Sequence, residues 1–117
     1  MTQGLRRIHV GDRMSEITIF NGIVYLAGQV AADANQGIRG QTTQVLAQID
    51  KLLGEAGSDR AHILRAQIYL VDMADFDAMN DVWDDWVAPG DAPPRATVQA
   101  NLARPGWKIE IVVTAAI

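Results

Sequence analysis

Alternating apolar and polar residues over the first third of the chain are typical of β-strands. Two such stretches, residues 16–20 and 23–30, are separated by Asn21-Gly22. An Asn-Gly pair in that position predicts a two-residue hairpin turn, because both turn residues must take positive φ. A short strand at residues 7–10 is also compatible with the pattern, and the small and polar residues 31–40 predict a surface loop.

Apolar residues next recur at helical spacing in two segments, residues 42–56 and 75–87. One apolar face on each segment is typical of an amphipathic helix, and Gly57 stands where the first helix needs its C-terminal cap. Further strands are predicted at 63–71, 95–100 and 107–116. This order of elements predicts a single α+β domain over residues 1–117, with a mixed sheet of about six strands and two helices packed on one face.

The second face of that sheet has no helix to cover it. Two predicted strands are nevertheless apolar on both faces, at residues 23–26 and 111–113. Such strands are expected where both faces of a sheet are buried, and a large exposed apolar patch usually marks an interface. Scattered apolar residues on the surface are the alternative, since they are common in monomers. We expect self-association.

Composition narrows the range of partners. The formal net charge of −4 disfavours nucleic acid, which binds clustered Lys and Arg. The chain lacks an apolar run of about 20 residues, the length that spans a bilayer, and its opening residues lack the apolar core of a signal peptide. It contains no cysteine, which excludes disulfides and thiolate chemistry. We expect a cytoplasmic protein that binds neither nucleic acid nor a membrane.

Most common catalytic motifs are absent. His9 and His62 are the only histidines, and no short ligand spacing joins them, so we expect no metal site. Neither serine lies in a Gly-x-Ser-x-Gly elbow, and there is no glycine-rich phosphate loop. The aspartates between residues 72 and 85 are interpreted as the solvated face of the second helix.

Arg95 is the strongest candidate for a binding residue. It follows Pro93-Pro94, which fix the start of a predicted strand, and its guanidinium offers a planar fork of donors that matches a carboxylate. A surface arginine in a salt bridge is the alternative interpretation. Asn80 lies within the apolar face of the second helix, where its amide needs a hydrogen-bond partner. That partner is either a neighbouring loop or a group of the same site.

Glu110 is the second candidate. The alternation of the last strand places it on the same face as Val112, in partly apolar surroundings. Burial there would favour the neutral carboxyl group, and a nearby arginine would oppose this. The side chain would then act as a general acid–base group or hold a water molecule. An exposed carboxylate paired with Lys108 or Arg65 is the alternative.

Several segments, in the same order, resemble one protein family. The C-terminal part resembles the signature region of the Rid family, also called YjgF/YER057c/UK114, through Pro94-Arg95-Ala96-Thr97-Val98-Gln99, Leu102 and Lys108-Ile109-Glu110-Ile111. Matching segments precede it at 23–29, 41–57, 72–76 and 79–80. Members of this family are reactive-intermediate (enamine/imine) deaminases. The resemblance implies a chorismate-mutase-like fold with the last strand in the middle of the sheet, and a homotrimer with clefts between its subunits.

The resemblance also implies roles for individual residues. Arg95 would hold the substrate carboxylate, Glu110 would position or activate water, and the backbone of Gly28 would line the cleft. Thr97 and Asn80 would line the same substrate-binding site. The reaction would hydrolyse 2-enamino or 2-imino acids of the 2-aminoacrylate type to 2-keto acids and ammonia. Neither a metal nor an organic cofactor would be required, because the substrate is already an activated imine.

Departures from the family pattern resemble a divergent subgroup. The N-terminal Gly-Pro-Tyr segment is missing, and Met14 stands about where its cleft-lining tyrosine would contact the substrate. Ala27 replaces a serine, and Val112 replaces a second acidic residue after Glu110. The enzyme interpretation therefore has an alternative, a non-catalytic trimer that binds a small carboxylated metabolite.

Overall fold

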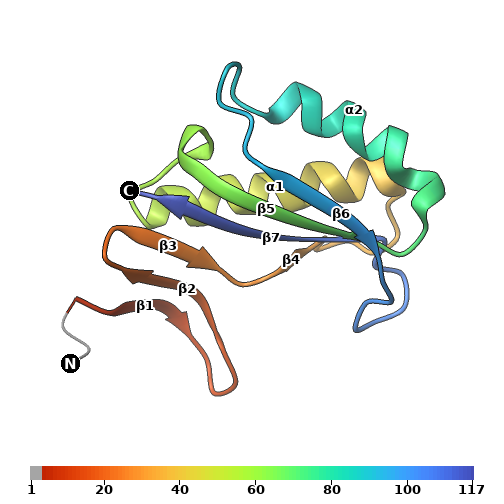
Figure 1. The fold of residues 1–117 in the computed structure, drawn as a ribbon. Coiled ribbons are helices and arrows are strands. Elements are labelled where there is room, and N and C mark those ends of the chain that lie inside the picture. The colour runs from red at the N-terminus through yellow and green to blue at the C-terminus, as the bar shows by residue number, and fades with distance from the viewer. Residues whose placement is uncertain (1–3) are drawn as a thin grey trace.

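The computed structural model describes residues 4–117, so the first three residues of the predicted domain lie outside the described chain. Residues 4–117 form a mixed sheet with two α-helices (Figure 1). The strands are β1 (Arg6–Val10), β2 (Ser15–Phe20), β3 (Ile23–Leu26), β4 (Gln29–Val30), β5 (Ile63–Leu70), β6 (Arg95–Gln99) and β7 (Ile109–Ala116). The helices are α1 (Ile38–Glu55) and α2 (Phe76–Trp86), and two short 3₁₀ turns are η1 (Arg60–His62) and η2 (Met73–Asp75).

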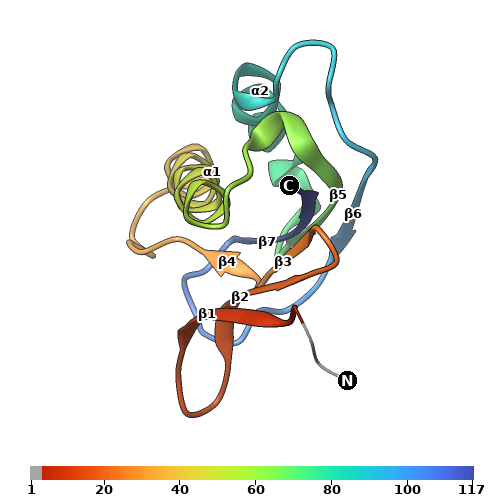
Figure 2. The same cartoon turned by 90° about the vertical axis from the view of Figure 1, so that its left-hand side faces the viewer.

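The strands are arranged in the order β1-β2-β3-β7-β5-β6, and β4 also pairs with β7. β5 and β6 are parallel, whereas the other neighbouring strands of the described chain are antiparallel. Both helices lie against one face of the sheet, and the β1–β2 hairpin extends away from them (Figures 1 and 2). The predicted fold is confirmed, including the position of the last strand in the middle of the sheet.

The N-terminal hairpin follows its local sequence closely. Asn21 and Gly22 have φ angles of 53° and 75°, and Phe20 pairs with Ile23 across the turn. Positive φ at both central residues matches the twist of the flanking strands, so the predicted two-residue turn is confirmed.

The single strand predicted over residues 23–30 is wrong, because it is interrupted at Ala27 and Gly28, between β3 and β4. Ala27 still donates its backbone N–H to the Glu16 carbonyl oxygen (2.9 Å), while Gln29 already pairs with β7. The buried Gln29 amide donates to the Ala27 carbonyl oxygen (3.1 Å) and to the Glu16 carboxylate (2.9 Å). These bonds satisfy polar groups that the break leaves outside the regular ladder.

Helix α1 begins at Ile38 rather than at residue 42, so the predicted loop over 31–40 is too long. Its first turn is held by the fully buried Gln41, whose amide donates to the Gly106 carbonyl oxygen and accepts from the Lys108 N–H (both 2.9 Å). A buried polar side chain adds nothing to an apolar periodicity, which explains the late predicted start. Gly57 directly follows the helical cap with a φ of +83°, as predicted.

The other predicted elements agree with the structure to within two residues at each end. The core lies between the helices and one face of the sheet, with fully buried side chains from α1, α2, β5 and β7. On the opposite face Tyr25 and Val98 remain 49% and 44% exposed, so the helices cover one face as expected. Neither helix of the described chain combines the length and apolar character needed to cross a membrane.

Candidate functional site

Strand register decides which candidate side chains can meet within one chain. On β6, Arg95 lies opposite Ala66 of β5, which is buried beneath the helices. On β7, Glu110 lies opposite Tyr69, an odd number of residues further along β5 and therefore on the other face. Arg95 accordingly faces the helices, whereas Glu110 faces the uncovered side. Within one chain the sheet itself separates these two residues.

Arg95 is held by one face of α2. Its Nη2 atom donates to Oδ1 of Asn80 (2.7 Å), and its Cζ atom lies 5.1 Å from the ring centre of Trp83 and 5.9 Å from that of Phe76. Phe76, Asn80 and Trp83 share one face of the helix because they are four and three residues apart. The partner of the Asn80 amide is therefore Arg95 rather than a neighbouring loop.

The charge of Arg95 has no close counter-ion in the described chain. Burial lowers the pKa of its guanidinium below the ordinary value, and the charge of Asp84 opposes this shift more weakly. An arginine still carries its proton at neutral pH. Within residues 4–117 no carboxylate oxygen lies within 4.0 Å of its nitrogens, so the salt bridge considered from sequence is wrong. This half-buried cation retains N–H donors for an anionic group from outside the chain.

Thr97 lies two positions after Arg95 on β6 and shares its face. Its hydroxyl oxygen is buried and has no hydrogen-bond partner among residues 4–117. Buried polar atoms normally have a partner. The Arg95 face of β6 therefore carries an unsatisfied hydroxyl as well as an uncompensated charge.

Glu110 borders a separate cavity on the uncovered face of the sheet. The cavity has a volume of about 280 Å³ and is lined by Tyr69, Glu110, Val112 and the segment 100–103 that follows β6. A Cβ atom at Gly28 would overlap the Glu110 carboxylate. Glycine at that position therefore lets the strand break between β3 and β4 come into direct contact with this carboxylate.

The Glu110 carboxylate makes no ion pair within residues 4–117. Arg65 donates to the side-chain oxygen of Gln67 (3.2 Å) instead. The pairing with Lys108 or Arg65 that the sequence allowed is therefore wrong. The carboxylate is half-buried, borders a cavity and stays available to bind a polar group there.

Met14 lies apart from both groups. It is 52% exposed in the turn between β1 and β2, which projects from the sheet in Figure 1. A cavity of about 380 Å³ at this turn is lined by residues that include Arg7 and Arg13, and neither Arg95 nor Glu110 borders it. The structure thus brings Arg95 together with Asn80, and Gly28 together with Glu110, but leaves Met14 separate.

The acidic residues of α2 point to solvent, as the sequence indicates. Asp77, Asp81 and Asp84 are exposed, and Asp81 accepts from Nη2 of Arg39 on α1 (2.7 Å). Among residues 4–117 no group of three or more His, Asp or Glu side chains is placed to hold a metal ion.

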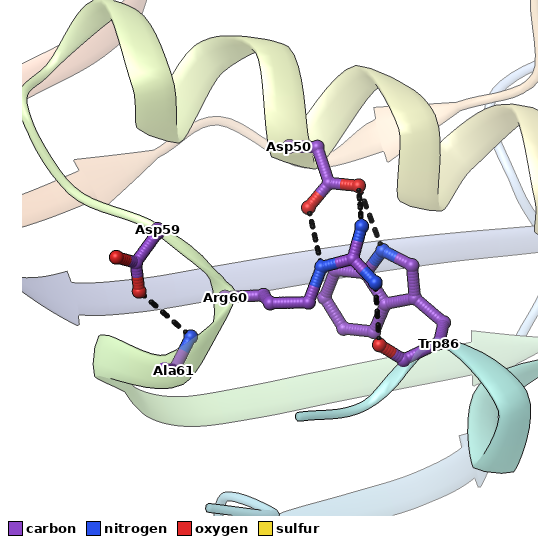
Figure 3. Close-up of polar contacts among 5 residues, drawn as sticks. All are labelled: Asp50, Asp59, Arg60, Ala61 and Trp86. Atoms are coloured by element: carbon purple, nitrogen blue, oxygen red, sulfur yellow. Dashed lines mark hydrogen bonds and ion pairs between the residues drawn. The ribbon is translucent and has the colours of Figure 1, made fainter. Parts of the chain in front are cut away.

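A polar network at the C-terminal end of α2 carries no local sequence signal (Figure 3). Arg60 donates from Nε and Nη2 to the Asp50 carboxylate (3.1 and 2.5 Å) and from Nη1 to the Trp86 carbonyl oxygen (2.7 Å). The Trp86 indole Nε1 donates to the same carboxylate (2.9 Å). The Asp59 side chain caps the turn that presents Arg60, through the Ala61 N–H (2.9 Å). Because its members lie 10 and 26 positions apart, sequence spacing does not reveal this network.

The chain matches a family model and a known protein along nearly its whole length. A family model described as Endoribonuclease L-PSP matches residues 5–117. A RutC family protein from Haemophilus ducreyi is 53% identical over 113 residues, which cover 97% of each chain. The chain belongs to the YjgF/Rid family. The resemblance drawn from Pro94-Arg95 and the segments around it is therefore confirmed.

Solved structures agree with this membership. NMB1025 from Neisseria meningitidis, described as a member of the YjgF protein family, is 49% identical with a TM-score of 0.93, over 96% of this chain and 93% of that one. YyfA from Yersinia pestis, described as a Rid family protein of unknown function, is 29% identical with a TM-score of 0.86, over 92% and 90%. The Rid fold is thus shared along nearly the whole chain.

Proposed function

We propose that this Rid-family protein hydrolyses reactive 2-enamino and 2-imino acids of the 2-aminoacrylate type to 2-keto acids and ammonia. The observation that carries the proposal is the state of Arg95. Its guanidinium is oriented by Asn80 and two aromatic rings, yet no carboxylate of the described chain lies within 4.0 Å of it. Such a cation is preorganised to bind the carboxylate of a substrate.

For this reaction the protein needs mainly to position the substrate and a water molecule. The enamine tautomerises to its imine, water adds to the imine carbon, and the carbon–nitrogen bond then breaks to release ammonia and the 2-keto acid. Arg95 would fix the carboxylate by two charge-assisted hydrogen bonds. Glu110 lies at the edge of its cavity and makes no ion pair within residues 4–117; it would hold the attacking water and accept its proton.

This assignment requires more than one copy of the chain. Arg95 and Glu110 lie on opposite faces of one sheet, so a site that uses both takes them from different subunits. The exposed Tyr25 and Val98 on the uncovered face supply an apolar surface for such assembly. Both features support the homotrimer with clefts between subunits that the family resemblance implies.

The test couples the protein to an amino-acid oxidase and follows the disappearance of the released imine. We expect wild-type protein to accelerate this loss and Arg95→Ala to lower kcat/KM by about 100-fold or more, since two charge-assisted hydrogen bonds are removed. Arg39→Ala, which removes an exposed arginine of α1, is the matched control. Light scattering should give the same mass for all three proteins. Full activity of Arg95→Ala would contradict the proposed function.

Binding without turnover is the second candidate function. The apolar Val112 lines the cavity beside Glu110. Glu110 is therefore the single carboxylate among the described residues that line this cavity. Saturable binding of pyruvate with no acceleration of imine loss would favour it. Cleavage of RNA is disfavoured by the net charge of −4, although the matching family model is described as an endoribonuclease.

A further inference from the structure

Four side chains form a continuous stack that joins Arg95 to the far end of α2. The Cζ atom of Arg60 lies 5.0 Å from the ring centre of Trp86, and the ring centres of Trp86 and Trp83 are 5.4 Å apart at an angle of 50°. Trp83 in turn lies 5.1 Å from the Cζ atom of Arg95. Each contact is within the range of favourable cation–π or aromatic pairing.

One end of this stack is firmly fixed. The Asp50 carboxylate accepts hydrogen bonds from Arg60 and from the Trp86 indole, so it ties α1 to both residues (Figure 3). Arg60 also donates to the main-chain carbonyl of Trp86 (2.7 Å). Trp86 is the last residue of α2, where carbonyl groups lack helical partners and a positive charge is favourable. The end of α2 is therefore held by its side chain and by its backbone.

The other end of the stack depends on α2 alone. The side-chain partners of Arg95 within residues 4–117 are Phe76, Asn80 and Trp83, all on this helix. Rotation or sliding of α2 would therefore move the Asn80 oxygen and the Trp83 ring together. The guanidinium would follow, because its plane is set by these contacts.

We propose that Asp50, Arg60 and Trp86 are positioning residues that set the orientation of the Arg95 guanidinium through Trp83. The inference rests on the proposed function only in assuming that Arg95 receives a carboxylate. A bidentate carboxylate needs the guanidinium fork in one plane and one direction, so a small reorientation removes one of its two hydrogen bonds. The Asp50 network thus acts on ligand affinity without touching the ligand.

The experiment compares Asp50→Asn and Trp86→Phe with wild type. Asp50→Asn keeps the shape of the side chain and removes its charge, whereas Trp86→Phe keeps an aromatic ring and removes the indole N–H. Asp81→Asn is the control, because Asp81 also links α2 to α1, through Arg39, but lies outside the stack. Pyruvate, a 2-keto acid of the proposed product class, is the probe, and its Kd is measured by calorimetry.

We expect the Kd for pyruvate to rise about tenfold in both variants, the loss of one charge-assisted hydrogen bond, and to stay within about twofold in Asp81→Asn. In the imine assay KM should rise by a similar factor while kcat stays within about twofold. The dichroism of the coupled indoles should weaken in Asp50→Asn. A purely structural network would lower the melting temperature and leave Kd, KM and the dichroism unchanged.

The outcomes separate the two proposals. Imine hydrolysis by wild type together with an unchanged Kd and KM in both Asp50→Asn and Trp86→Phe would overturn the positioning role and keep the function. Pyruvate binding that weakens in these variants, with no hydrolysis by wild type, would keep the positioning role and overturn the function. Should wild type neither bind pyruvate nor hydrolyse imines, both proposals are wrong.

Discussion

Two arginines lie against the same helix in nearly the same way and differ in whether a carboxylate compensates their charge. Arg60 lies 5.0 Å from the Trp86 ring and Arg95 lies 5.1 Å from the Trp83 ring. Arg60 donates from all three nitrogens, two of them to the Asp50 carboxylate. Arg95 makes one side-chain hydrogen bond in the described chain, to the neutral amide of Asn80.

The presence or absence of an internal carboxylate distinguishes a structural arginine from a binding one. An internal carboxylate satisfies the guanidinium of Arg60 and converts it into a cross-link between elements. An amide orients the guanidinium of Arg95 without neutralising it. Aromatic rings support both residues, so the lack of a counter-ion within residues 4–117 is what leaves Arg95 available to a ligand.

The largest effect is expected when Arg95 is given a carboxylate partner like that of Arg60. In Asn80→Asp a charged oxygen would replace the amide oxygen that now lies 2.7 Å from Nη2. It would compete with the substrate carboxylate, so we expect kcat/KM for imine hydrolysis to fall about 100-fold. The thermal midpoint should not fall, because a charge pair forms. Activity near the wild-type value would show that the missing counter-ion is irrelevant.

The reverse change tests whether Arg60 is the structural member of the pair. Arg60→Ala removes three hydrogen bonds and leaves Asp50 without its cation, so we expect the free energy of unfolding to fall by about 2 kcal/mol. Arg95→Ala should lose less than half as much. Urea unfolding at one fixed protein concentration measures both, since subunit assembly contributes to stability. Equal losses would remove the distinction between the two residues.

A change on the opposite face of the sheet, away from both arginines, should affect turnover and leave binding intact. A methyl group at residue 28 would collide with the Glu110 carboxylate. We therefore expect Gly28→Ala to lower kcat about tenfold by displacing this group, while the Kd for pyruvate stays within about twofold. Steady-state kinetics and calorimetry separate the two effects. A Kd that rises as much as kcat falls would mean that Gly28 and Arg95 serve the same step.

The smallest expected effect concerns an exposed pair. The His62 ring Nδ1 donates a hydrogen bond to the Asp59 carboxylate, which raises the pKa of His62 and lowers the pKa of Asp59. The stabilisation linked to His62 is present below its unfolded pKa and lost as pH rises through its folded pKa. That of Asp59 is present above its unfolded pKa and lost as pH falls through its folded value.

Both side chains are more than half exposed, so this pair should hardly change stability and the test is spectroscopic. An NMR titration of the His62 ring should give a pKa above its ordinary 6.5 in wild type and a return towards that value in Asp59→Asn. The same pKa in both proteins would show that exposed partners do not couple here.

Local signals predicted most of the fold, because alternation, helical spacing and the Asn21-Gly22 turn depend on neighbours in sequence. The wrong predictions, at the start of α1 and at the break between β3 and β4, have long-range causes. Gln41 holds the first turn of α1 by accepting from the Lys108 N–H, and Gly28 lies in a strand break against the Glu110 carboxylate. No pattern within a short window contains either partner.

The candidate site likewise has some features that local sequence predicts and others that depend on long-range packing. Arg95 and Asn80 stand out from their local settings, but their pairing depends on how α2 packs beside β6. From sequence, Trp83 is interpreted as an ordinary core residue. An aromatic residue that supports a guanidinium has the same helical spacing as one that fills a core. The network of Asp50 and Arg60 joins elements that only the packed fold brings together.

The central position of β7 has a consequence for how the chain becomes a sheet. This strand is the last in the chain, yet it joins the β1–β3 ribbon to the β5–β6 pair. During synthesis both parts leave the ribosome before the strand that connects them, and each waits with an unpaired edge. Completion of the sheet is therefore a late event on the folding pathway, dominated by contacts distant in sequence. A nascent chain that stalls before residue 109 leaves the edges of β3 and β5 unpaired in addition to the outer edges of β1 and β6, and unpaired edges favour aggregation.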